Sequence, residues 1–308
     1  MDTSNKYSVT VKAYKHNFKT PCILGFSLFT WLGFKKENLS AEDELIKTIK
    51  YCILFIQKEE YEKAEQLLHV ALRQSQQVQH DLGITYVYDV MANLALQREQ
   101  LDKAKTLFIS VAQRIMADGA QEDDLRVVHI SVKLARISHL KKEYTTAQLG
   151  YEWCLEKLHK AIENDPDDTN KKLLAMTEDW YGRLLIDCNK AEAGLRLMVD
   201  SLNKMKEISE VEKQHVVIQL NDIGTVYDRI GETDQGIEYF NEAIEMAKDL
   251  NMAELGIIYV NLGRAYMKKN LIITARKYCG HAWKVGVLSK DETIKKEAEL
   301  CFKEIKDM

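Results

Sequence analysis

Cysteine and histidine are the residue types of this 308-residue chain best suited to metal binding or nucleophilic catalysis. The six cysteines contain no CxxC pair, and no two of the eight histidines lie four positions apart, the spacing that puts two ligands on one face of a helix. No glycine-rich phosphate-binding loop and no HExxH motif occurs. The sequence therefore predicts no metal site, no cofactor and no catalytic residue, which argues against an enzyme.

The cysteines also lack the spacing of a disulfide framework. Such frameworks stabilise short, loop-rich secreted chains, and this chain is neither short nor rich in loops. We therefore expect no obligatory disulfide. We expect Cys52, Cys154 and Cys279 to be small residues of a packed interior.

The composition predicts helices nearly throughout. Hydrophobic residues make up 46% of the chain and charged residues 29%, while only 2 prolines and 14 glycines interrupt it. The 43 lysines and arginines are balanced by 47 acidic residues, which gives a formal net charge of −4. Because no basic excess is available to neutralise phosphates, we expect no nucleic-acid partner.

A pattern of small and bulky residues repeats about every forty positions. Six times, a small residue is followed four positions later by a bulky one and then by a smaller residue three positions further on. These triplets begin at Ala64, Ala104, Ala147, Gly194, Gly236 and Ala275. Twelve positions before each triplet stands another small residue, in order Cys52, Ala92, Ala135, Gly182, Gly224 and Gly263. Self-similarity at a fixed period indicates an array of similar structural units.

The fixed interval of twelve indicates a helical hairpin. Two antiparallel helices approach closely only where both present small side chains, so the turn between them must keep those residues in register. The connections between units vary in length, which costs little free energy in a surface loop. These features resemble the tetratricopeptide repeat, a helix–turn–helix unit of about 34 residues. The resemblance is clearest at residues 221–244 and 260–283.

We therefore predict an all-α fold, a tetratricopeptide-repeat alpha-solenoid with about six helical hairpins stacked as a right-handed superhelix. The array is predicted to occupy residues 40–288. A C-terminal capping helix is predicted within residues 289–308, where Ser289 and Glu292 have the spacing of a capping box. One face of this last helix is rich in Lys and Glu, as expected where an array meets water.

Residues 1–39 precede the array, and we predict that they form a targeting or membrane-proximal segment. Residues 1–20 contain four lysines and several Ser and Thr, as mitochondrial transit peptides do, although arginine is absent. Residues 21–34 are apolar and are followed by Lys35 and Lys36, but the run is shorter than the roughly 20 residues of a spanning helix. Residues 21–36 could lie at a membrane surface or act as a short anchor, which the resemblance described below would place at the inner membrane, or they could dock onto the first repeat.

Five residues on predicted first helices are candidates for partner binding. Tyr86, Asp89 and Asn93 lie within about 60° of one another on a helix face distinct from its apolar stripe. First helices line the concave surface of a repeat array, where an aromatic beside polar groups is typical of an interface anchor. Alternatively, this face is only hydrated or bonds a neighbouring hairpin. Asn221 and Asn261 are the other two candidates.

Several segments also resemble one family within the repeat superfamily, that of the mitochondrial tetratricopeptide repeat protein 19. The resemblance rests on residues 26–34, 41–46, 64–73, 84–108 and 121–136. It implies a mitochondrial protein of the inner membrane that takes part in the assembly and maintenance of respiratory complex III, the ubiquinol–cytochrome c reductase of electron transport. It further implies binding to complex III after insertion of the Rieske iron–sulfur subunit, and help in clearing the cleaved amino-terminal fragments of that subunit. No catalytic residue belongs to this function.

Two other functions stay open on the residues alone. One is a cytosolic adaptor that binds peptides, such as a chaperone co-factor or a motor light chain. Chaperone-type repeats hold a terminal carboxylate with Lys and Asn on successive first helices, but the asparagines here stand at different helical phases without a matching basic set. The other is an enzyme on a solenoid scaffold, for which the sequence shows no convergent nucleophile and base.

Overall fold

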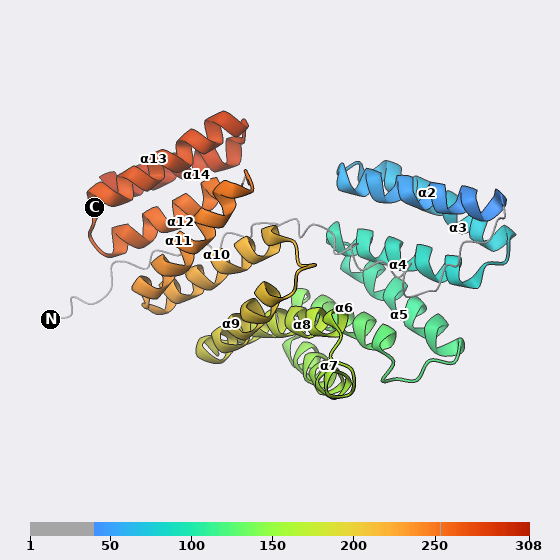
Figure 1. Cartoon of the computed structure of the whole chain (residues 1–308). Helices are drawn as coiled ribbons and strands as arrows, with labels where there is room; N and C mark the ends of the chain where they lie inside the picture. Colours follow the sequence, from blue (N-terminus) through green and yellow to red (C-terminus); the bar gives the residue numbers. More distant parts are fainter. Residues whose placement is uncertain (1–39, 253) are drawn as a thin grey trace. The chain divides into compact units, whose positions relative to one another are not determined.

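The computed structural model describes residues 40–252 and 254–308, and this part of the chain folds into thirteen α-helices without a strand (Figure 1). The predicted segment 1–39 lies outside the described residues. In chain order the helices are α2 (Ser40–Gln57), α3 (Tyr61–Gln77), α4 (Asp81–Gln97), α5 (Leu101–Ala117), α6 (Leu125–Leu140), α7 (Tyr144–Asn164), α8 (Asp168–Asp187), α9 (Ala191–Glu207), α10 (Lys213–Ile230), α11 (Thr233–Asp249), α12 (Leu255–Lys268), α13 (Ile272–Ser289) and α14 (Glu292–Lys306).

The helices form the six predicted hairpins, from α2 with α3 through α12 with α13, followed by the single helix α14 (Figure 1). The chain divides into two compact units at Ile130 and Ser131, within α6. The handedness of the stack stays a prediction. The all-α repeat fold is confirmed.

The turn inside each hairpin has one conformation that recurs six times. The residue seven positions after the small residue of the first helix adopts a left-handed backbone in every hairpin, at Glu59, Glu99, Lys142, Asn189, Gly231 and Asn270. The next backbone N–H then bonds back to the carbonyl five residues earlier, as Glu232 N does to Tyr227 O at 3.0 Å. This identical closure explains why the interval of twelve residues never varies.

The predicted small-residue contacts are present between the two helices of a hairpin. In the α8–α9 hairpin, Gly182 and Gly194 approach so closely that a Cβ atom on Gly182 would lie 2.7 Å from the Gly194 carbonyl oxygen. In α10–α11, a Cβ atom on Gly224 would lie 2.8 Å from the ring of Phe240. Every triplet of the second helices is buried. The register inferred from residue size is therefore confirmed.

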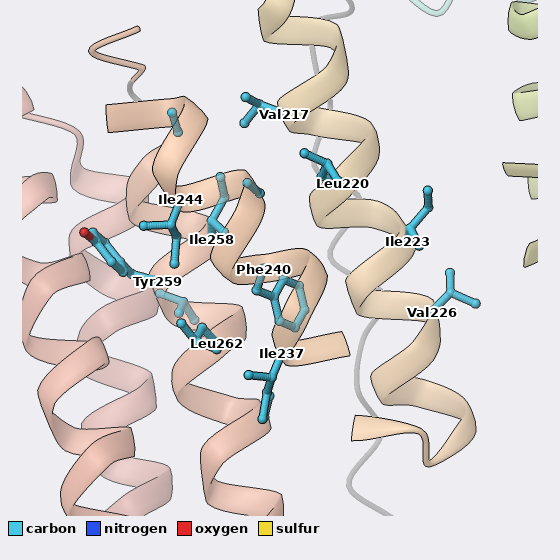
Figure 2. Close-up of a cluster of buried hydrophobic side chains, with 14 of the residues drawn as sticks. Val217, Leu220, Ile223, Val226, Ile237, Phe240, Ile244, Ile258, Tyr259 and Leu262 are labelled. Atoms are coloured by element: carbon cyan, nitrogen blue, oxygen red, sulfur yellow. The ribbon is translucent and has the colours of Figure 1, made fainter. Parts of the chain in front are cut away.

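Each unit has its own hydrophobic core. In the first, Leu45 and Ile49 of α2 pack with Leu68 of α3 and with Val87 and Val90 of α4. In the second, the core continues from the end of α8 to α14, and Figure 2 shows its part between α10, α11 and α12. The labelled side chains there are Val217, Leu220, Ile223, Val226, Ile237, Phe240, Ile244, Ile258, Tyr259 and Leu262.

The start of the last helix differs from the prediction. Ser289 is not the N-cap, because α13 continues through it and its hydroxyl bonds back to Val285 O at 2.9 Å. The N-cap of α14 is Asp291, whose carboxylate accepts the backbone N–H groups of Thr293 at 2.8 Å and Ile294 at 3.1 Å. Ser289 and Asp291 could each cap the start of a helix. Because α13 continues through Ser289, Asp291 is the N-cap of α14.

The structure also contains a disulfide, contrary to our expectation. Cys279 of α13 and Cys301 of α14 are bonded, with their Cα atoms 6.1 Å apart, and both are fully buried. Cys279 does occupy the small-residue position predicted for it, but α14 packs along α13 and brings Cys301 to the same place in the core. Cys52 and Cys154 are free and buried, as predicted, and burial raises the pKa of each thiol to about 12. Neither is a reactive thiolate.

Candidate partner-binding surface

Three arginines occupy one equivalent position on the first helices of the second unit. Arg136 of α6, Arg183 of α8 and Arg264 of α12 each directly follow the small residue that faces the second helix of the hairpin. Successive residues of a helix are rotated by about 100° relative to each other. These side chains therefore point away from the second helix of their own hairpin and lie beside the first helix of the neighbouring hairpin. The position therefore suits contacts between neighbouring hairpins and contacts with a partner.

Arg183 links two first helices through carboxylates. Its Nε and Nη2 atoms donate to Asp179 at 2.7 and 3.2 Å, and its Nη1 atom donates to Asp222 of α10 at 2.6 Å. Although burial disfavours the charged guanidinium, the two carboxylates raise the pKa of Arg183. Gln219 also donates to Asp179 at 3.2 Å. This arginine is held in one orientation by its own chain.

The predicted asparagines belong to the same ladder of contacts. Asn261 Nδ2 of α12 donates to Asn221 Oδ1 of α10 at 2.9 Å, and Asn221 is buried. Arg264 continues the ladder to α14, where it donates to Glu304 at 2.9 and 3.0 Å and to Glu297 at 3.2 Å. The structure thus brings Asn221 and Asn261 together, and the hydrogen bond between their side chains joins α10 to α12.

Arg136 differs from the other two arginines because it forms no ion pair with a carboxylate of the described residues. Its Nη1 atom donates to His139 Nδ1 at 3.1 Å, and its guanidinium carbon lies 5.6 Å from the centre of the Trp180 ring. An arginine can only donate, so His139 Nδ1 accepts and the proton of the neutral ring sits on Nε2. That nitrogen then donates to Asp187 at 2.9 Å, and this bond lowers the pKa of the Asp187 carboxyl.

The surroundings of Arg136 favour an additional negative charge. Burial lowers the pKa of its guanidinium, and the positive charge of Arg183 acts in the same direction. Beside it lies the buried Tyr151, whose hydroxyl interacts with the Arg136 guanidinium, while burial raises the pKa of Tyr151. A guanidinium next to an aromatic ring can bind a carboxylate of a partner. We call Arg136 and Trp180 the candidate docking pair.

The other predicted trio is less accessible than its sequence indicates. Tyr86 and Asp89 are only 4% and 5% exposed, whereas Asn93 is partly exposed. Asn93 Nδ2 donates to the Asp89 carboxylate at 3.0 Å and to the Asp89 carbonyl oxygen at 2.8 Å. A role of the trio in partner binding stays a prediction. The trio lies in the first unit, so no geometry relates it to Asn221 and Asn261 of the second.

Arg136, Trp180, Arg183 and Arg264 were not predicted as site residues. The sequence contains a signal for the arginines, because arginine directly follows the small residue of the first helix in three of the six hairpins. The predicted asparagines stand at unequal helical phases, whereas these arginines share one phase. The sequence distinguishes Arg183 from Arg136 only in part. Asp179 stands four positions before Arg183, where Val132 precedes Arg136, but the contact of Arg183 with Asp222 depends on the packing of α10.

The described residues hold no cluster of three or more His, Cys, Asp or Glu side chains that could bind a metal ion. Over the same residues, no helix is both long and apolar enough to cross a membrane.

Comparison with known proteins agrees with this architecture. The family model described as tetratricopeptide repeat matches residues 220–250, in α10 and α11. Among solved structures, a signal-transduction ATPase with a tetratricopeptide repeat sensor from Pyrococcus horikoshii matches with a TM-score of 0.62 at 17% identity, over 84% of this chain and 37% of that one. An identity this low shows only the shared fold.

Two curated relatives are similar along most of their length. Tetratricopeptide repeat protein 19 homolog, mitochondrial, from Drosophila melanogaster is 37% identical over 283 residues, which cover 91% of this chain and 77% of the relative. Tetratricopeptide repeat protein 19, mitochondrial, from Homo sapiens is 31% identical over 263 residues, which cover 82% of this chain and 69% of the relative. Because the similarity extends over nearly the whole array, this chain belongs to the family of the mitochondrial tetratricopeptide repeat protein 19.

Proposed function

We propose that this protein is a non-enzymatic factor that binds respiratory complex III, the ubiquinol–cytochrome c reductase, at the mitochondrial inner membrane. It helps to maintain the complex by clearing the cleaved fragments of the Rieske iron–sulfur subunit. The observation that carries the proposal is family membership over 91% of the chain, since the resemblance that implies this function runs through the same array. A mitochondrial location is supported by the names of the relatives.

The geometry of the second unit supports binding rather than chemistry. The ladder from Asp179 to Asn261 fixes neighbouring first helices by side-chain bonds, so the surface is ordered before a partner arrives. Beside this ladder, the candidate docking pair offers a cation and an aromatic ring, which are common anchors in protein interfaces. We propose that the pair contacts an acidic segment of complex III or of a Rieske fragment.

The alternative of a cytosolic peptide-binding adaptor has weaker support. The repeat fold is compatible with it, but the curated relatives carry mitochondrial names. The ladder asparagines bond to their own chain and do not stand in a set of free basic residues. No specific observation favours the adaptor over the complex III factor.

Removing the protein from cells should cause amino-terminal Rieske fragments to accumulate on complex III and should reduce the activity of the complex. The physical reason is that fragments left in place occupy surface that the intact subunit needs. Fragment content is measured by immunoblotting of isolated complex III, and re-expression of the full chain should restore it. Unchanged fragment content, with loss of the protein verified, would contradict the clearing role.

A further inference from the structure

The outward face of α13 combines positive charge with exposed apolar side chains. The opposite face of this helix packs into the core through Ala275, Cys279, Ala282 and Gly286, all buried. The residues that point away from it are Ile273, Arg276, Lys277, Trp283, Lys284, Val287 and Leu288, all exposed. We call these seven residues the α13 basic face.

The cations of this face have no carboxylate partner among the described residues, although Lys277 Nζ lies 5.8 Å from the centre of the Tyr278 ring. Helix α13 contains no Asp or Glu, and Arg276, Lys277 and Lys284 form no ion pair with the described residues. The two lysines at the end of α12 provide a contrast, since Lys268 is paired with Asp228 and Lys269 with Asp234. Unpaired cations grouped on one helix face attract an anionic surface rather than stabilise the fold.

The apolar part of the face is unusually accessible. Ile273 is 88% exposed, Leu288 73%, Val287 42% and Trp283 41%. Exposed apolar side chains scattered singly are ordinary, but four on one face of one helix mark an interaction surface. Tryptophan and lysine together are typical of the boundary between water and lipid, where the ring and the methylene groups enter the apolar layer and the ammonium group stays at the headgroups.

We infer that the α13 basic face docks onto an anionic phospholipid surface, lying parallel to the membrane without crossing it. Lipid headgroups supply the missing negative charge, and the outer acyl layer covers the apolar side chains, so one ligand satisfies both parts of the face. A second copy of the same face would bring six unpaired cations together, which disfavours self-association. This contact is separate from any membrane contact of residues 21–36 and does not rest on the proposed function.

A neighbouring histidine reports the positive potential of the region. Partial burial lowers the pKa of His281, and the charges of Lys277, Lys248 and Lys284 lower it further. Every charge of the described residues that shifts the pKa of this ring is positive. The local excess of positive charge is therefore a property of the folded unit and not only of the α13 sequence.

The test is binding of the purified full chain to vesicles by co-sedimentation. We expect binding to phosphatidylcholine vesicles that contain phosphatidylglycerol, little binding to pure phosphatidylcholine, and weakening by added salt. Replacing Arg276, Lys277 and Lys284 by Gln should reduce the affinity about a hundredfold, since each cation near an anionic surface contributes about fivefold, or about 1 kcal/mol. In the apolar part, Leu288→Gln should reduce binding severalfold.

Matched controls are available in the same unit. The control residues are Arg196, Lys160 and Lys213, which are exposed and form no ion pair with the part of the chain that the structure describes. Their replacement by Gln changes the net charge by the same amount. Leu149 is 64% exposed, and Leu149→Gln is the control for Leu288→Gln. Each control variant should bind like the wild type, and melting curves should show that all variants fold. Equal loss in the two charge variants, full retention in the α13 variant, or no binding of the wild type to anionic vesicles would each overturn the inference.

Discussion

Replacing Gly182 or Gly224 by leucine will lower the free energy of unfolding by about 3 kcal/mol, because neither hairpin has room for a side chain. At Gly182, a Cβ atom would lie 2.7 Å from the Gly194 carbonyl oxygen and 2.8 Å from Met198 Cγ. At Gly224, the nearest atoms are the Phe240 ring at 2.8 Å and the Gly236 carbonyl oxygen at 3.0 Å. Backbone oxygens cannot move aside, so the two helices must separate.

The matched control is Gly280→Leu on α13. Gly280 also lies within a helix, but the nearest atom to its Cβ position is Phe302 Cζ at 3.9 Å. Leucine there should be neutral or slightly stabilising, because it has a higher helix propensity than glycine. Chemical denaturation of the three variants and the wild type measures the differences. If Gly182→Leu and Gly224→Leu unfold at the same denaturant concentration as Gly280→Leu, close packing does not set the register of the hairpins.

The second large effect is expected from the bond between α13 and α14. Replacing Cys301 by alanine should destabilise the chain by about 3 kcal/mol, since the disulfide closes a loop with a sequence separation of 22 and so restricts the unfolded chain. A reducing agent should have a similar effect on the wild type and almost none on the variant. Differences in melting temperature with and without reductant measure both.

Two further variants make this prediction specific. Cys279→Ala should cost about as much as Cys301→Ala, and the double variant little more, because one bond is lost in each case. Cys188→Ala removes a free, partly exposed cysteine and should be nearly neutral. Equal melting of the oxidised and reduced wild type would show that the bond does not stabilise the chain.

The hairpins could be predicted from the sequence because their closure is local. The same left-handed residue and the same backbone hydrogen bond close all six turns, so small residues at a constant interval mark the two helices of each hairpin. Contacts that depend on the packing of a third helix could not be predicted. The Cys279–Cys301 bond arises only because α14 lies along α13, and no spacing motif records that contact.

The candidate site was less predictable than the fold. Helical periodicity gives the direction of a side chain, but it does not say what covers that side chain, which is why the burial of Tyr86 and Asp89 was not foreseen. The position of the arginines, directly after the small residues of the first helices, could be recognised in the sequence. The lack of an ion pair at Arg136 has two causes. Val132 stands four positions before it, where Asp179 precedes Arg183, and the packed helices bring Asp222 to Arg183 instead.

The central claim is that this chain binds complex III through its second unit, and the most direct measurement is quantitative co-purification from solubilised mitochondria. Complex III subunits should be recovered with the tagged full chain. Recovery should fall at least tenfold with the Arg136→Ala/Trp180→Ala variant, because a buried cation and an aromatic anchor each contribute about 1 kcal/mol or more. The control Arg196→Ala/Trp153→Ala removes the same residue types from second helices and should retain full recovery. Melting curves establish that both variants fold. Absence of complex III subunits from the wild-type purification would contradict the proposed function, and full recovery with a folded docking-pair variant would contradict the assignment of the site.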